Sequence, residues 1–123
     1  LTLCRVQVIR NHGENHLVVD SEKAVPLAIA ANELIHNAID HGFAGRKEGI
    51  LAVNTFVEGT VLHVSIKNNG NLLPEDFGVR IFNLGLQIVR NLSELELKGR
   101  FEIKNEEGMV SADIYCPLSL MEA

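Results

Sequence analysis

The stretch LAIAANELIHNAIDHG, residues 27–42, carries an apolar pattern and a polar pattern on one predicted helix. Its apolar residues recur at the spacing of a buried helix face: Leu27, Ala31, Leu34 and Ala38. Glu33, Asn37 and His41 are four residues apart, so they form a polar stripe beside that face. Polar side chains near a core need partners, and a bound ligand can supply them. The stripe alone is equally typical of a solvated helix face.

The segments around this helix predict the fold class. Ser21 is the expected N-cap of the helix and Gly42 its expected terminator. Alternating or β-rich runs predict strands at 4–8, 16–19, 50–57, 61–67, 101–103 and 110–116. A loop over 68–82 leads to a second helix near Leu84, with a proposed buried stripe of Leu84, Ile88, Leu92 and Leu95. Strand pairs separated by helices predict an α+β sandwich, with a mixed, largely antiparallel sheet and helices packed on one face.

Length and composition narrow the class of protein. The 123 residues predict one domain over 1–123, and the first residue, Leu1, indicates a fragment of a longer chain. A net charge of −5 argues against general binding to nucleic acid or to anionic membranes. Cys4 and Cys116 lack metal-ligand spacing, and the strand alternation turns both inward as small hydrophobic residues. We therefore expect a reduced, cytoplasmic protein without membrane contact.

Two further motifs contain glycine at places where a backbone can approach a ligand. Asn68-Asn69-Gly70 directly follows a predicted strand, where a glycine permits close approach. Asn83-Leu84-Gly85-Leu86 opens the second helix, whose free N–H groups and dipole favour phosphate. Each motif also has an ordinary explanation, a surface turn for the first and a helix start containing glycine for the second.

The order and spacing of ELIHNAIDHGF (33–43), VSIKNNGNLLPEDF (64–77) and NLGLQIVRNL (83–92) resemble a known set of motifs. They are similar to the N box and the two glycine boxes of sensor histidine kinase ATP-binding domains. Those domains belong to the Bergerat-fold ATPases, with gyrase, the heat-shock chaperones of that fold and the MutL mismatch-repair proteins. The residues within these motifs most resemble those of the branch that includes the ethanolamine-responsive sensor kinases and the HWE kinases. In that branch, the lid between the two glycine boxes is short.

This resemblance implies roles for individual residues. Asn37 would bind Mg²⁺ through its side-chain oxygen, and Glu33 would be the catalytic base or water-orienting group. His41 would pack near the adenine, Asn68 would read its amino group, and Gly70 would lie under the base. The whole nucleotide-binding set that the resemblance implies is Asn37, His41, Asn68, Gly70, Leu73, Asn83, Leu84, Gly85 and Leu86.

Three positions depart from the family pattern. Asn68 stands where relatives usually have Asp, so the base-reading side chain is neutral. Val110 stands where many relatives have a Thr that supports that Asp. Asp40 replaces a Lys near the phosphates, which leaves Arg46 or Lys47 as possible substitutes. The changes at Asn68 and Val110 together predict weak ATP affinity or loose base selectivity.

The predicted function is that of the catalytic, ATP-binding domain of a sensor histidine kinase. It would use ATP and Mg²⁺ and transfer the γ-phosphate to a histidine on a separate dimerisation domain, because no histidine here sits in an acceptor-like motif. Its partners would be its own phosphoacceptor helices and a cognate response regulator, in a homodimeric full-length protein that binds no nucleic acid. Two alternatives are a degenerate, non-catalytic binding module and an anti-sigma-factor-like serine kinase on the same fold.

Overall fold

The structure is a computed structural model that describes residues 4–12, 19, 21–77 and 83–118. Its strands are β1 (Arg5–His12), β2 (Glu48–Glu58), β3 (Val61–Asn68), β4 (Arg100–Glu106) and β5 (Met109–Pro117). Its helices are α1 (Ser21–Asn37) and α2 (Leu84–Asn91). Each helix continues into a π-helical turn, Ala38–Gly42 after α1 and Leu92–Glu96 after α2.

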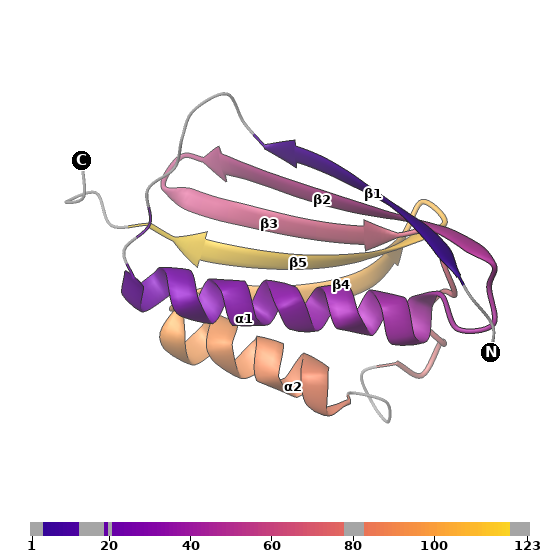
Figure 1. Cartoon of the computed structure of the whole chain (residues 1–123). Helices are drawn as coiled ribbons and strands as arrows, with labels where there is room; N and C mark the ends of the chain where they lie inside the picture. The colour runs from indigo at the N-terminus through magenta and orange to yellow at the C-terminus, as the bar shows by residue number, and fades with distance from the viewer. Residues whose placement is uncertain (1–3, 13–18, 20, 78–82, 119–123) are drawn as a thin grey trace.

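All five strands form one sheet in the order β1-β2-β3-β5-β4 (Figure 1). The edge strand β1 runs parallel to β2, and every other neighbouring pair is antiparallel. The predicted hairpin at 58–60 is confirmed, with Gly59 at φ 63° in the turn. Glu107 and Gly108, both at positive φ, make the turn between β4 and β5. The mixed, largely antiparallel sheet that the sequence predicts is therefore confirmed.

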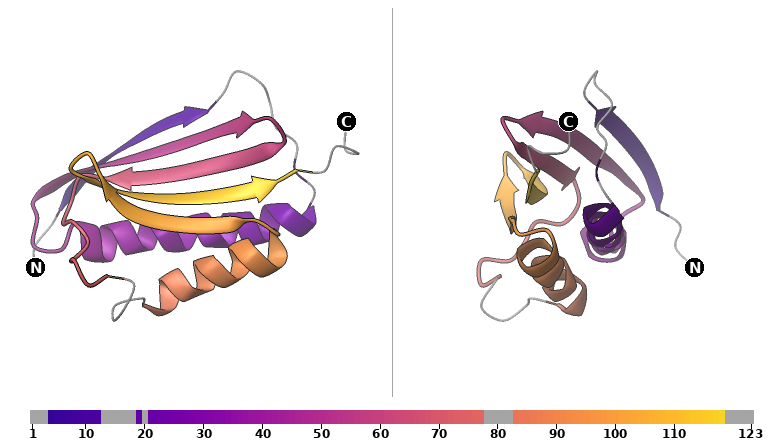
Figure 2. Two further views of the ribbon diagram at one scale, coloured as in Figure 1. Left: turned by 180° about the vertical axis from the view of Figure 1, so that it is seen from behind. Right: turned by 90° about the vertical axis from the view of Figure 1, so that its left-hand side faces the viewer.

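Both helices cover the same face of the sheet, as Figure 2 shows. On β3, Leu62, Val64 and Ile66 are buried beneath them in a core that includes Leu34 of α1. The alternate residues of β3 face away from the helices, which is the two-residue period of a strand. In Figure 1, α2 begins beneath the C-terminal end of α1 and runs back along it. This antiparallel arrangement brings the end of α1 to the beginning of α2, and the α+β sandwich is confirmed.

The first helix follows its prediction closely but ends in a different way. It begins at Ser21, and Leu34 and Ala38 of the predicted apolar face are buried. At its end, the Phe43 N–H donates to the Ala38 carbonyl at 3.0 Å, a five-residue π-type bond. Gly42 is the last residue of the helix, as predicted, and its lack of a side chain also allows close packing, because a Cβ there would lie 2.9 Å from Asn68 Oδ1.

The predicted stripe of the second helix is wrong at Leu84 and Leu95, while Leu92 packs against the core. Leu84 and Leu95 are 71% and 64% exposed, whereas Leu86, Val89 and Leu97 are fully buried. The Leu97 N–H donates to the Leu92 carbonyl at 2.9 Å, so five residues separate equivalent positions in this turn. An α-helical period continued past Leu92 therefore assigned Leu95 to the core in place of Leu97.

The remaining predictions concern the N-terminal region and the cysteines. Of the predicted strand at 16–19, residues 16–18 lie outside the described part of the chain, and Val19 is not in a strand. Cys116 is buried and Cys4 packs against the core, and neither forms a disulfide, as expected of small inward-facing residues. In the described ranges, no helix has the length and apolar character to cross a membrane.

Candidate functional site

A cavity of about 230 Å³ lies where α1 ends, β3 ends and α2 begins. Six of the residues predicted to bind nucleotide line it: Asn37, His41, Asn68, Leu73, Asn83 and Leu86. Residues that the sequence reasoning did not assign also line it: Gly42, Asn71, Leu72, Pro74 and Phe77. Three motifs that are far apart in the sequence thus meet around one cavity.

The polar end of the cavity is built around Asn83, the N-cap of α2. Its Oδ1 accepts a hydrogen bond from the Leu86 N–H at 2.9 Å, which satisfies one unpaired donor of the helix. Its Nδ2 donates to Asn37 Oδ1, also at 2.9 Å. A single side chain therefore ties the predicted metal ligand on α1 to the N-terminus of α2.

Glu33 and Gly85 border this polar end without lining the cavity. A Cβ on Gly85 would lie 3.1 Å from Glu33 Oε2, so the carboxylate sits directly over the first turn of α2. No described residue accepts a hydrogen bond from the N–H groups of Leu84 and Gly85. These donors and the helix dipole make the start of α2 suited to an anionic group, with Leu84 contributing backbone while its side chain is exposed.

The opposite end of the cavity is largely apolar and contains Asn68. This side chain is only 5% exposed, and its Oδ1 accepts a hydrogen bond from the Gly70 N–H at 2.9 Å. Val110 of β5 pairs with Asn68 of β3 in the sheet register and also lines the cavity. The predicted proximity of these two residues is confirmed. The site therefore has a neutral carboxamide at the position predicted to read the base, with no hydroxyl at the neighbouring position.

Gly70 has a packing role in this structure. A Cβ at this position would overlap with the backbone carbonyl of Gly42 and approach Phe43 Cδ1 to 3.0 Å. The residue does not itself line the cavity. Its lack of a side chain lets the chain after β3 lie directly against the end of α1, and that contact closes one wall of the cavity.

Two asparagine side chains that the sequence did not single out hold the segment after β3 in place. Asn71 Nδ2 donates to the carbonyl oxygens of His41 and Ala44, at 3.2 and 2.9 Å. On the other side, Asn105 Oδ1 accepts from the Leu73 N–H at 2.9 Å, and Asn105 Nδ2 donates to the Leu73 carbonyl at 3.0 Å. Asn105 therefore fixes both backbone groups of one cavity residue.

The basic residues considered as substitutes for a phosphate-binding Lys do not reach the cavity. Arg46 Nε donates to Asn71 Oδ1 at 3.0 Å, in the network that supports the loop. Lys47 is exposed, and neither it, Arg46 nor Asp40 lines the cavity. In the described residues, donors for an anion at this site come from backbone N–H groups and asparagine amides.

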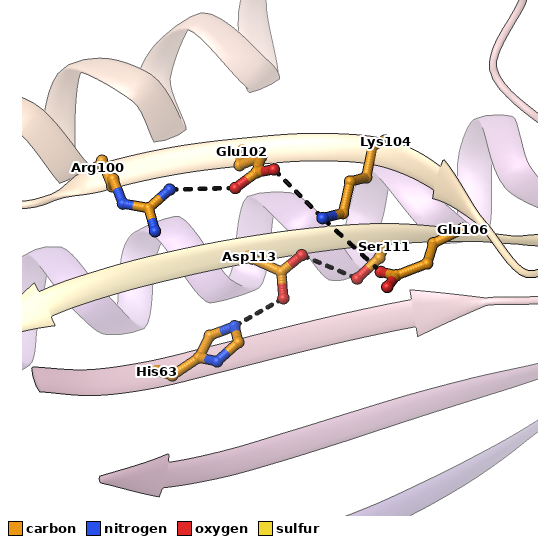
Figure 3. Close-up of polar contacts among 7 residues, drawn as sticks. All are labelled: His63, Arg100, Glu102, Lys104, Glu106, Ser111 and Asp113. Atoms are coloured by element: carbon orange, nitrogen blue, oxygen red, sulfur yellow. Dashed lines mark hydrogen bonds and ion pairs between the residues drawn. The ribbon is translucent and has the colours of Figure 1, made fainter. Parts of the chain in front are cut away.

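A second polar cluster lies on the sheet face away from the helices (Figure 3). His63 Nε2 lies 2.7 Å from Asp113 Oδ1, and Ser111 Oγ donates to Asp113 Oδ2 at 2.8 Å. Tyr115 stacks on the His63 ring at 4.3 Å between centroids, and burial raises the pKa of this tyrosine. Because these contacts join β3 to β5 on the far side of the sheet, the cluster is separate from the cavity.

Comparisons with known proteins agree with this arrangement. Residues 22–119 match the family described as histidine kinase-, DNA gyrase B- and HSP90-like ATPases. The sensor histidine kinase PdtaS of Mycobacterium tuberculosis is 34% identical over 90 residues, which cover 72% of this chain and 18% of that protein. Blue-light-activated histidine kinase 2 of Erythrobacter litoralis is 33% identical over 76 residues, or 60% of this chain and 22% of that protein.

Solved structures show the same fold. The Erythrobacter litoralis EL346 blue-light activated histidine kinase superposes with a TM-score of 0.82 at 26% identity, over 93% of this chain and 36% of that one. The catalytic domain of histidine kinase ThkA superposes with a TM-score of 0.79 over 91% of this chain and 78% of that one. At 23% identity, this likeness is evidence for the fold alone. ThkA has also been solved in complex with the response regulator protein TrrA.

The chain spans about a fifth of the length of the curated relatives that it matches, between 18% and 22%. The matches confirm the resemblance to sensor histidine kinase ATP-binding domains and support the HWE-like branch. By its sequence match over 22–119 and by its fold, the chain belongs to the family of histidine kinase-, DNA gyrase B- and HSP90-like ATPases.

Proposed function

We propose that this chain is the ATP-binding catalytic domain, over 1–123, of a longer two-component sensor histidine kinase. It holds Mg·ATP and presents the γ-phosphate to a histidine on a separate dimerisation domain, in the cytoplasm and in a homodimeric protein. The observation that supports this most is the hydrogen bond from Asn83 Nδ2 to Asn37 Oδ1, at the N-terminus of α2. Family membership supports ATP as the nucleotide.

The polar end of the cavity fits a metal-bound triphosphate. Mg²⁺ prefers oxygen ligands, and Asn37 Oδ1 is a side-chain oxygen held at this end by its contact with Asn83. The N–H groups of Leu84 and Gly85 are available to the phosphates. When bound, Mg²⁺ neutralises charge on the phosphates, and phosphoryl transfer depends chiefly on such neutralisation and on positioning. Glu33, whose carboxylate lies beside Gly85, is the residue that we assign as the catalytic base or water-orienting group.

The apolar end of the cavity fits the base. Leu73, Leu86 and Val110 offer apolar contacts to a flat ring, and Asn68 is the buried polar group that meets its edge. His41, which is exposed at the cavity rim, packs against the outer side of the ring. An apolar slot with one well-placed polar group is typical of small-ligand sites.

A second candidate is a non-catalytic module that keeps the fold for regulated partner binding. Three observations favour it. Asn68 lacks a negative charge, and Val110 lacks a hydroxyl. Arg46 does not line the cavity and is instead hydrogen-bonded to Asn71. The arrangement of Glu33, Asn37 and Gly85 around the start of α2 favours the catalytic function. Measurement of nucleotide binding separates the two.

The first test is isothermal titration of a non-hydrolysable ATP analogue, with and without Mg²⁺. The wild type should bind more tightly with Mg²⁺, and Asn37→Ala should lower that Mg²⁺-dependent affinity at least tenfold because a metal ligand is lost. Asn32→Ala is the matched control, since Asn32 is exposed on the same helix and does not line the cavity. Unchanged affinity in Asn37→Ala would show that the metal site is placed wrongly.

The second test concerns the acceptor and the partners. ATP labelled at the γ-phosphate should not label the isolated domain. It should label an added protein fragment that contains the phosphoacceptor helices, and the label should then pass to a response regulator. The ThkA complex with TrrA supports a response regulator as partner. Acid-labile phosphohistidine on the isolated domain would contradict a separate acceptor.

A further inference from the structure

We propose that this site accepts 6-oxopurine nucleotides, such as inosine triphosphate, alongside adenine nucleotides, because Asn68 presents an amide N–H₂ group to the base. The inference rests on the proposed function in one respect, namely that the base lies at the apolar end beside Asn68. Given that placement, the inference concerns the hydrogen-bonding groups at the C6 and N1 positions of the purine.

The orientation of the Asn68 carboxamide follows from its backbone neighbour. The Gly70 N–H donates to this side chain at 2.9 Å in a buried environment. Only the oxygen of a carboxamide accepts a hydrogen bond, so Oδ1 must face Gly70. The N–H₂ group is therefore on the other branch of the side chain, and no described residue accepts a hydrogen bond from its Nδ2.

The surroundings oppose a flip of this amide. A flipped carboxamide would set Nδ2 against the Gly70 N–H, donor against donor, and would leave buried groups unpaired. Gly42 packs close to the carboxamide, since a Cβ there would lie 2.9 Å from Oδ1 and 3.2 Å from Nδ2. Val110, the cross-strand neighbour, has no hydroxyl that could accept from the amide. The donor branch is thus the one left for a ligand.

The two kinds of purine differ in the group that meets this donor. Adenine carries an amino group at C6, which only donates, whereas guanine and hypoxanthine carry a carbonyl there, which accepts. Nδ2 can donate to the O6 carbonyl directly, and it can still donate to N1 of adenine, which is an acceptor. A carboxylate in the same place would accept from the adenine amino group but would face the O6 carbonyl acceptor to acceptor. A neutral carboxamide therefore removes the reason for rejecting 6-oxopurines.

The test is a titration of the Mg²⁺ complexes of ATP and inosine triphosphate into the wild type and Asn68→Asp. Inosine triphosphate is the probe because it has the O6 carbonyl without the 2-amino group of guanine. We expect its Kd to lie within tenfold of that of ATP in the wild type. In Asn68→Asp the ratio of the two Kd values should rise at least tenfold against inosine triphosphate, because a binding site that leaves polar groups unpaired discriminates strongly.

Asn69→Asp is the matched control, with the same charge change one residue away. Asn69 is exposed, does not line the cavity, and uses its Oδ1 to accept from the Ile50 N–H at 2.8 Å, which an Asp can still do. Its ratio of Kd values should equal that of the wild type. An equal rise in Asn69→Asp would assign the effect to net charge and overturn the proposal.

The outcomes separate this inference from the function on which it rests. If neither nucleotide binds, both fail. If ATP binds and inosine triphosphate binds more than tenfold less tightly, or if Asn68→Asp leaves the ratio unchanged, only the inference fails. If thermal unfolding shows that Asn68→Asp does not fold, 1-deazapurine riboside triphosphate, which has no hydrogen-bond acceptor at either the C6 or the N1 position, replaces the variant. It must bind the wild type more weakly than inosine triphosphate, and equal affinity would overturn the inference.

Discussion

The side chain of Asn105 should control the rigidity of the loop that follows β3, over residues 71–77. Asn105→Ala removes two hydrogen bonds to Leu73, of 2.9 and 3.0 Å, from an exposed position on the edge strand β4. Each hydrogen bond contributes about 0.5–1.5 kcal/mol net, and exposure favours the lower half of that range. We therefore expect a local loss of about 1–2 kcal/mol, which corresponds to about a 5- to 30-fold change in an opening equilibrium.

Amide hydrogen exchange followed by NMR measures this directly. The Leu73 N–H should exchange about 5- to 30-fold faster in Asn105→Ala, because its acceptor is gone and local opening governs the rate. Asn105→Asp keeps the acceptor for that N–H but loses the donor to the Leu73 carbonyl, so its exchange rate should be intermediate. Since Leu73 lines the cavity, ATP affinity should fall in the same order.

The control is Lys104→Ala, the preceding residue on the same strand. Lys104 lies within 4 Å of the carboxylates of Glu102 and Glu106, on the far face of the sheet. It takes no part in the hydrogen bonds between Asn105 and Leu73. Its hydrogen bond to Glu102 raises the pKa of the Lys104 ammonium, which marks a contact separate from the cavity. Exchange at Leu73 that is equal in Asn105→Ala and the wild type would refute the argument, as would an equal rise in Lys104→Ala.

Two further predictions concern stability. Gly70→Ala should lower the free energy of unfolding by about 3 kcal/mol, because the new methyl group overlaps with the rigid carbonyl of Gly42. Gly85→Ala is its control in urea denaturation: the new methyl group would lie 3.1 Å from Glu33 Oε2, at the end of a side chain that can shift, and 3.4 Å from Asn83 Oδ1, an ordinary contact, so helix propensity should give a gain of up to ~1 kcal/mol. A loss in Gly85→Ala as large as that in Gly70→Ala would contradict this. Asp113→Ala should cost about 2 kcal/mol in thermal or urea unfolding, since it leaves a buried cross-strand network without its acceptor. Lys104→Ala, in the exposed charge ladder beside it, should change stability little, and a comparable loss there would argue against a special role for the buried network.

Local patterns in the sequence predicted the sheet and the first helix well. Alternation in β3 and β5 follows from a strand with one face against the core, so Leu62, Ile66 and Ile114 could be assigned to the buried side. The second helix was harder, because leucines occur on both of its sides. Only the π-helical turn after Leu92 decided that Leu97, not Leu95, is buried.

The sequence by itself determined the sandwich, the family and the three motifs that surround the cavity, because periodicity and short motifs are local properties of the chain. The tertiary structure decided how those motifs touch. Asn83 meets Asn37 across 46 residues of sequence, and Asn105 meets Leu73 across 32. Such contacts join a side chain to a residue in a distant part of the chain and leave no periodic signal in either segment. The hydrogen bond that orients Asn68 differs from these, because its donor is the Gly70 N–H only two residues along the chain, and the tertiary structure decides only that this contact is buried beside the cavity.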